Sequence, residues 1–207
     1  PGETYQPGKP PYGLNNTGGK GSASPSDWTA GVSSIVYVRI VDEYWNTVNT
    51  NHNITLTLSD LFDTPTSQTK SILNGVDSFT FTPRTAESQT VKAEDLDPTP
   101  PTYSQYTTPS FNVKPNIPAR LQIIVPGEVA VPGSNSATGK YGSPSQRTAG
   151  VSFAIEIRAT DDYWNVVSTN PTTFLTTTDP YDQTYSQPEP ISIPLLNGTS
   201  THYHFFV

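Results

Sequence analysis

The sequence predicts an all-β protein made of two tandem copies of one unit, and three observations lead to that prediction. Only 14% of its 207 residues are charged, against a usual share of about 25%, and 21 residues are proline. Short segments rich in β-branched or aromatic residues alternate with turn residues, and no segment keeps a helical period. A set of short motifs also occurs twice in the same order.

Composition and charge exclude several classes of protein. The net charge is −7, and the 11 Lys and Arg residues form no basic run, so we expect no nucleic-acid partner. No stretch approaches the roughly 18 apolar residues that span a bilayer, so we expect no membrane-spanning segment. The absence of cysteine excludes disulfides, zinc–thiolate sites and a cysteine nucleophile.

The internal repeat has a period of about 120 residues, and small changes in spacing place insertions in loops. The matching motifs are Pro1-Gly2-Glu3 with Pro126-Gly127-Glu128, Thr29-Ala30-Gly31-Val32-Ser33 with Thr148-Ala149-Gly150-Val151-Ser152, Asp42-Glu43-Tyr44-Trp45-Asn46 with Asp161-Asp162-Tyr163-Trp164-Asn165, Asp60 and Asp63 with Asp179 and Asp182, and Leu73-Asn74-Gly75 with Leu196-Asn197-Gly198. So many matches in one order indicate a duplicated structural unit.

Alignment of the two copies fixes the orientation of one strand. Apolar residues alternate with polar ones from position 151 to 158 in the second copy, as in a half-buried strand. The inward-facing residues there are Val151, Phe153, Ile155 and Ile157, and their counterparts in the first copy are Val32, Ser34, Val36 and Val38, followed by Ile40. Ile35, Tyr37 and Arg39 are then expected to face outward.

Further strands are predicted at 54–58, 78–82, 90–94 and 110–113, separated by Asn-Gly and Pro-containing turns. About seven short strands per unit are typical of an immunoglobulin-like β-sandwich. The predicted fold is therefore two tandem immunoglobulin-like sandwiches, with repeat 1 at residues 1–117 and repeat 2 at residues 118–207.

Each sandwich is expected to be incomplete at one end. An alternating strand at 119–125 precedes the second Pro-Gly-Glu motif, whereas the first motif begins the sequence. Repeat 2 in turn ends before the counterparts of strands 90–94 and 110–113. Either the sequence is part of a longer repeat protein, or neighbouring copies supply the missing strands by strand addition.

These motifs resemble a known family. Leu-Gln-Ile-Ile-Val-Pro-Gly-Glu at 121–128, the Thr-Ala-Gly motif and the Asp-x-Tyr-Trp-Asn turn are similar to bacterial Ig-like repeats of large surface proteins, including the repeats of invasin-type adhesins. The resemblance covers essentially the whole chain. It implies an extracellular, non-catalytic rod or fibre of stacked sandwiches, and it carries over no catalytic residue.

The Asp-x-Tyr-Trp-Asn turn has two interpretations. In the structural one, Asp and Asn side chains bond backbone amides while the aromatic residues cover the end of a sandwich. In the functional one, carboxylate and amide oxygens bind calcium. The candidate ligands are Asp42, Glu43 and Asn46 in repeat 1 and Asp161, Asp162 and Asn165 in repeat 2, with Asp60, Asp63, Asp95 or Asp97 as further contributors from neighbouring loops.

Other candidate sites are weaker. Trp28, Trp45 and Trp164, together with the 11 tyrosines, fit a sugar-stacking platform or, more simply, core and inter-domain packing. His202 and His204 lie two apart on a strand, but no third metal ligand accompanies them. Gly18-Gly19-Lys20 and Gly139-Lys140 lack phosphate-loop spacing and are interpreted as flexible loop glycines. The sequons at Asn15, Asn53 and Asn197 are candidate glycosylation sites.

No nucleophile elbow accompanies the three histidines, so we expect no enzyme activity. The predicted function is a structural repeat of an extracellular surface protein or filament that needs no cofactor. Its expected partners are other copies or adjoining repeats, with surface glycans as a further candidate. Two alternatives stay open: a calcium-stiffened adhesin stalk, and a carbohydrate-binding or spacer module of a secreted enzyme.

Overall fold

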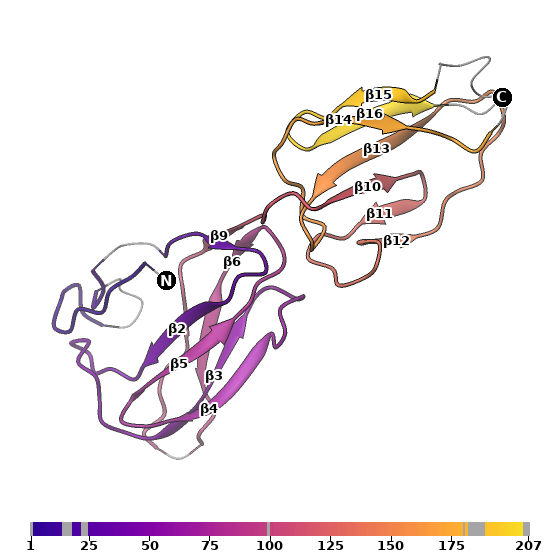
Figure 1. The fold of residues 1–207 in the computed structure, drawn as a ribbon. Coiled ribbons are helices and arrows are strands. Elements are labelled where there is room, and N and C mark those ends of the chain that lie inside the picture. Colours follow the sequence, from indigo (N-terminus) through magenta and orange to yellow (C-terminus); the bar gives the residue numbers. More distant parts are fainter. Residues whose placement is uncertain are drawn as a thin grey trace. The chain divides into compact units, whose positions relative to one another are not determined.

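Strands joined by turns, bends and irregular segments make up the computed structural model, which describes residues 2–13, 18–21, 25–98, 100–179, 181 and 189–204. The all-β prediction is confirmed, since these residues form strands in several small sheets and no helix. None of the described segments is a helix that could cross a membrane. Contacts divide the chain into two units, Pro1–Lys114 and Pro115–Val207 (Figure 1). The predicted division at 117/118 lies close to this boundary.

The described residues of unit 1 form three sheets. Its strands are β1 (Trp28–Thr29), β2 (Ser34–Arg39), β3 (His52–Leu58), β4 (Ser67–Ile72), β5 (Val76–Phe81), β6 (Ser88–Gln89), β7 (Val91–Asp95), β8 (Tyr106–Thr107) and β9 (Phe111–Lys114). The sheet orders are β2-β5, β4-β3-β7-β8 and β1-β9-β6. All pairings are antiparallel except that of β1 with β9.

In unit 2 the part of the chain that the structure describes also forms three sheets, all antiparallel. Its strands are β10 (Arg120–Ile124), β11 (Glu128–Ala130), β12 (Lys140–Gly142), β13 (Phe153–Thr160), β14 (Thr172–Leu175), β15 (Ile191–Pro194) and β16 (Thr199–His204). The sheet orders are β10-β13-β16, β11-β12 and β14-β15. By sequence alignment, β13, β14, β15 and β16 correspond to β2, β3, β4 and β5 of unit 1.

The same Asn-Gly turn precedes β5 and β16. Asn74 and Gly75 have φ angles of 55° and 74°, and Asn197 and Gly198 have φ angles of 51° and 86°. Two successive residues at positive φ are what a tight hairpin turn needs, and Asn and Gly adopt this conformation most readily. These turns therefore fix the register of both hairpins.

The predicted strand orientation is confirmed except at its first residue. Ile35 and Tyr37 are exposed on β2, Val36 and Val38 are half-buried, and Ile40 just beyond is buried. The prediction for the first inward residues was wrong, because Val32 and Val151 are 48% and 56% exposed. Each follows a Thr-Ala-Gly turn in which its amide donates back to the threonine carbonyl, so both strands begin later than expected.

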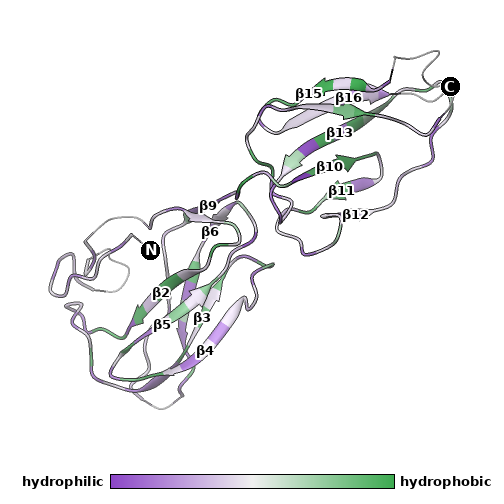
Figure 2. Ribbon diagram, viewed as in Figure 1, coloured by the Kyte–Doolittle hydropathy of each residue, from purple (hydrophilic) through white to green (hydrophobic). Residues whose placement is uncertain are grey.

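Strands at 52–58, 76–81, 91–95 and 111–114 overlap the predicted segments within one or two residues. Strand β4 was not predicted, because its residues are almost all hydrophilic (Figure 2). Only Ile72, its last residue, is buried. Polar strands of this kind give no alternating apolar signal.

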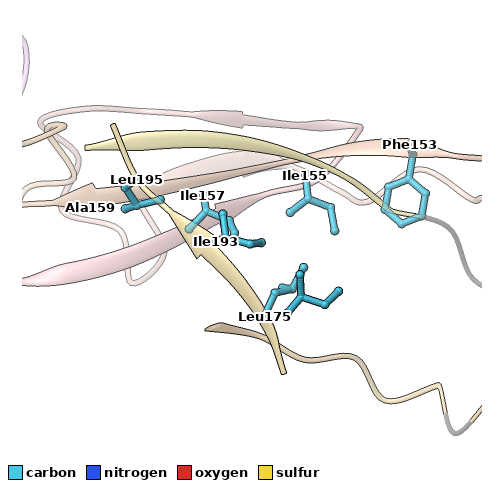
Figure 3. Packing of buried hydrophobic residues seen from close by; sticks show 8 residues of the cluster. Phe153, Ile155, Ile157, Ala159, Leu175, Ile193 and Leu195 are labelled. Atoms are coloured by element: carbon cyan, nitrogen blue, oxygen red, sulfur yellow. The ribbon is translucent and has the colours of Figure 1, made fainter. Parts of the chain in front are cut away.

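The hydrophobic core of unit 2 lies between β13 on one side and β14 with β15 on the other. β13 contributes one apolar face, and β14 and β15 with the residue after β15 contribute the other (Figure 3). The buried cluster comprises Phe153, Ile155, Ile157, Ala159, Leu175, Ile191, Ile193 and Leu195. The period-2 alternation of β13 therefore directs one face of this strand into the cluster.

The substitution Ile157→Ala should destabilise unit 2 by about 2–5 kcal/mol, because it removes buried methylenes and leaves a cavity. Phe174→Ala on β14 is the matched control: this side chain is 68% exposed, and its loss should change stability by less than about 0.5 kcal/mol. Urea unfolding of the full chain, followed by tryptophan fluorescence, measures both. Equal effects would contradict the assigned core.

Candidate functional site: the tryptophan turns

The tryptophan turn of unit 1 (residues 42–46) is held by a single carboxylate. Oδ1 of Asp42 accepts the backbone N–H groups of Tyr44 at 2.9 Å and Asn46 at 2.8 Å. Oδ2 accepts the Asn46 side-chain amide at 3.0 Å. A backbone bond from the Asp42 amide to the Asn46 carbonyl, 3.0 Å, closes the turn. Asp and Asn are therefore used as turn residues here.

The tryptophan turn of unit 2 (residues 161–165) repeats this arrangement in a buried setting. Oδ1 of Asp161 accepts the backbone amides of Tyr163 and Asn165 at 2.9 and 3.0 Å. Oδ2 accepts the Asn165 side-chain amide at 2.9 Å and the Asn116 backbone amide at 3.0 Å. Asp161 is fully buried, whereas Asp42 is exposed. The same set of aspartate hydrogen bonds, called here the aspartate clamp, is therefore exposed in unit 1 and buried in unit 2.

Both turns place a tryptophan at positive φ, 67° at Trp45 and 65° at Trp164. A bulky residue rarely adopts this conformation, which costs about 1–3 kcal/mol unless the surroundings enforce it. The indole N–H groups are anchored on backbone carbonyls, from Trp45 to Pro11 at 2.8 Å and from Trp164 to Ser136 at 3.0 Å. The strain is therefore offset by contacts with the segment that precedes each turn.

That segment is the N-terminal hairpin of each unit, formed by residues 3–6 with 18–21 and by residues 128–131 with 139–142. Its glycines pack directly on the tryptophans: a Cβ on Gly139 would lie 2.0 Å from Cγ of Trp164, and one on Gly19 would lie 2.7 Å from Cβ of Trp45. The interpretation of Gly18, Gly19 and Gly139 as flexible loop glycines was wrong, because all three are buried. Only glycine allows this close approach.

A lysine–glutamate pair crosses each hairpin, with Lys20–Glu3 at 2.8 Å and Lys140–Glu128 at 2.7 Å. Burial acts to raise the pKa of Glu128, but hydrogen bonds from the Lys140 side chain and the Val125 amide outweigh it and lower the pKa. Burial likewise acts to lower the pKa of Lys20, and the hydrogen bond to Glu3 leads the interactions that raise it. The repeated Pro-Gly-Glu and Gly-Lys motifs carried the sequence signal for these pairs.

The calcium interpretation remains a prediction. The carboxylates of Asp42 and Asp161 accept N–H groups, which accounts for their use in the turn without a cation. Glu43 is exposed, and Asp162 pairs with Arg120 at 3.1 Å. Over the part of the chain that is described, no three His, Asp or Glu side chains gather as a metal site would require.

The additional acidic residues are also engaged by backbone amides. Asp60 is buried and accepts the amides of Phe62, Arg84 and Thr85. The Asp95 carboxylate accepts the amide of Asp97. Burial raises the pKa of Asp63, against the amides of Thr82 and Thr64 that lower it. Asp182 lies outside the described residues.

The remaining candidate site residues do not gather at one place. Trp28 is buried against Phe111, with ring centroids 4.5 Å apart. The rings of His202 and His204 are 5.8 Å apart on β16, and burial followed by the charge of His204 lowers the pKa of His202. Of the three candidate glycosylation sites, Asn53 and Asn197 are exposed, and Asn15 lies outside the described residues.

Compared with protein-family models and with curated protein sequences, the chain gives no match.

Replacement of Asp161 by alanine should destabilise unit 2 more than Asp42→Ala destabilises unit 1. Asp161→Ala leaves buried amide N–H groups without an acceptor, and each one lowers the free energy of unfolding by about 1–3 kcal/mol. The amide groups around Asp42 can instead bond to water, because that turn is exposed. Thermal unfolding of the two variants of the full chain measures the difference. A larger loss from Asp42→Ala would contradict the assigned roles.

The pKa of Asp42 should lie below its ordinary value, because the Asn46 side chain and then the Asn46 backbone amide stabilise the carboxylate. A carboxyl whose pKa is lower in the folded state stabilises the fold above its unfolded pKa, and that contribution disappears as pH falls through the folded pKa. Carbon NMR titration of the Asp42 carboxyl measures this. Asn46→Ala should move the Asp42 midpoint upward, and an unchanged midpoint would contradict the assigned cause.

Proposed function

We propose that this chain is a non-catalytic structural repeat of an extracellular surface protein or filament, built from two immunoglobulin-like β-sandwiches. One observation carries the proposal: the tryptophan turn and its hairpin occur twice, and their polar groups are used to hold the turn and hairpin together. Repetition of a self-contained unit is typical of rods and fibres, in which each unit contributes length.

Packing supports the sandwich assignment. In unit 2, β13 faces β14 and β15 across one apolar cluster, the arrangement from which a two-layer β domain is built. In unit 1, β3 and β5 both supply buried residues, among them Leu56, Leu58, Phe79 and Phe81. The strand number and the Asn-Gly hairpins are further features of this class.

The chemistry of the chain supports a mechanical function. Prolines at 115 and 118 fix φ beside the boundary between the units and so restrict bending there. The low charge gives little repulsion between copies, so side-by-side association of rods is compatible with the composition. The partners are other copies of the chain or adjoining repeats, at a cell surface or in a fibre.

The tryptophans favour the structural role over carbohydrate binding. Trp28 and Trp164 are buried, and Trp45 is half-buried with its indole N–H on a backbone carbonyl. A sugar platform needs exposed aromatic faces. Their packing therefore supports a spacer or rod.

Stretching of single molecules tests the proposal. The full chain should show two separate unfolding events, one per unit, and the force of each should be the same with millimolar calcium and after chelation. A marked softening on chelation would instead support the calcium-stiffened stalk. A single weak event would contradict two mechanically independent units.

A further inference from the structure

Within the described residues, one edge of strand β2 is paired with another strand and the other edge is not. It pairs along its whole length with β5, from Ser34↔Phe81 to Arg39↔Val76. On its other side, called here the far edge of β2, no strand lies within the described residues. An exposed row of backbone groups on a six-residue strand is a ready template for another strand.

The opposite edge of this sheet is covered. Side chains from β4 reach the backbone carbonyls of β5: Lys70 donates to Ser78, and Gln68 donates to Thr80 at 2.6 Å. Long polar side chains are a common way to protect a sheet edge. The far edge of β2 has no such protection among the hydrogen bonds of the described residues, and Ile35 and Tyr37 are exposed along the same strand.

In unit 2 the corresponding edge is filled. β10 pairs antiparallel with β13, the counterpart of β2, from Arg120↔Thr160 to Ile124↔Glu156 (Figure 1). The apolar residues of β13 are accordingly better covered: Ile155 and Ile157 are buried, whereas Val36 and Val38 on β2 are half-buried. The chain itself therefore shows which kind of strand completes this sheet.

Two side chains of β10 hold it in place. Arg120 pairs with Asp162 at 3.1 Å and lies over the Trp164 ring, 5.0 Å from its centroid. Gln122, which is buried, donates to the Thr138 and Gly139 carbonyls at 2.9 Å and accepts from Arg158 at 3.3 Å. These contacts tie β10 to the tryptophan turn and to the N-terminal hairpin.

Unit 1 holds the counterparts of these receptor groups. Glu43 and Trp45 align with Asp162 and Trp164, Gly19 aligns with Gly139, and Arg39 aligns with Arg158. Glu43 is exposed and Trp45 is half-buried, whereas Trp164 is only 7% exposed. The groups that bind β10 in unit 2 are therefore present in unit 1 beside a free edge.

We propose that the far edge of β2 is a docking site for one kind of partner, an extended strand of the β10 type carried by another repeat of this kind. The strand joins antiparallel to β2, its arginine pairs with Glu43 and stacks on Trp45, and its glutamine reaches Arg39. This inference rests on the proposed structural role and names the partner that extends the sheet.

One residue tunes access to the site. The Tyr5 ring lies 4.4 Å from the guanidinium carbon of Arg39, the group that the incoming glutamine would reach. Ala130 stands at the corresponding place in unit 2, where Arg158 is open to Gln122. We therefore expect an incoming strand to displace Tyr5, and Tyr5→Ala to strengthen its binding.

The test adds a synthetic peptide of residues 116–126 to the full chain and follows backbone hydrogen exchange. Exchange on the open side of β2 should slow by about tenfold or more at saturation, while β13 stays unchanged. A peptide carrying Gln122→Pro is the matched control, because proline removes a ladder donor. Protection of β13 alone, or equal protection by the control peptide, would overturn the proposal.

A charge swap tests the register. Glu43→Lys should weaken peptide binding by about two- to fivefold, the size expected for an exposed ion pair, and the peptide with Arg120→Glu should restore it. Binding that ignores both changes would overturn the assigned register.

If the free peptide binds too weakly to be detected, the same strand can be joined covalently to the chain. Residues 116–125 are placed directly before Pro1 in the full chain, as they stand before Pro126, with a Gln122→Pro version as control. Equal exchange of β2 in these two chains would overturn the docking site. The stretching experiment would still report two unfolding events if only this inference failed, so the two proposals fail separately.

Discussion

The structure of both units depends on a tryptophan held at positive φ. This conformation is unfavourable for a large side chain, so something outside the turn must stabilise it. The aspartate clamp fixes the turn backbone, and the buried hairpin glycine gives the indole ring a surface without a Cβ. Without the aspartate or without the glycine, the tryptophan would no longer be held at positive φ. This dependence explains why Asp, Trp, Asn and the distant glycine occur together in both copies.

The tryptophan turn also links segments that are far apart in the sequence. In unit 2 it joins the N-terminal hairpin through Trp164, β10 through Arg120 and the segment before β10 through Asn116. In unit 1 the turn joins the hairpin through Trp45 and Tyr5, whose hydroxyl donates to the Trp45 carbonyl at 2.6 Å. The additional contacts in unit 2 account for the burial of Asp161 and the exposure of Asp42.

Sequence reasoning reached the β class and strands β2, β3, β5, β7, β9, β10 and β13, because the two copies constrain each other. It did not predict β14, β15 or the short strands β1, β6, β8, β11 and β12. A single copy of residues 34–40 is ambiguous, since Ser34 interrupts its apolar pattern, and the second copy resolves it. The start of β13 and the polar strand β4 were missed, because a turn residue such as Val151 and a strand such as 67–72 give misleading or absent apolar signals. The roles of Gly19 and Gly139 depend on contacts with a tryptophan about 25 residues away, which no local pattern records.

The cover that Lys70 and Gln68 place over β5 has a consequence for the way such a sheet can grow. A sheet with two free edges can add strands indefinitely, and this leads to uncontrolled aggregation. Here growth beyond β5 is closed by charge and by occupied carbonyls, so the sheet of β2 and β5 can lengthen in one direction only. In unit 1, strand addition is therefore confined to the β2 side, which is the side that β10 already fills in unit 2.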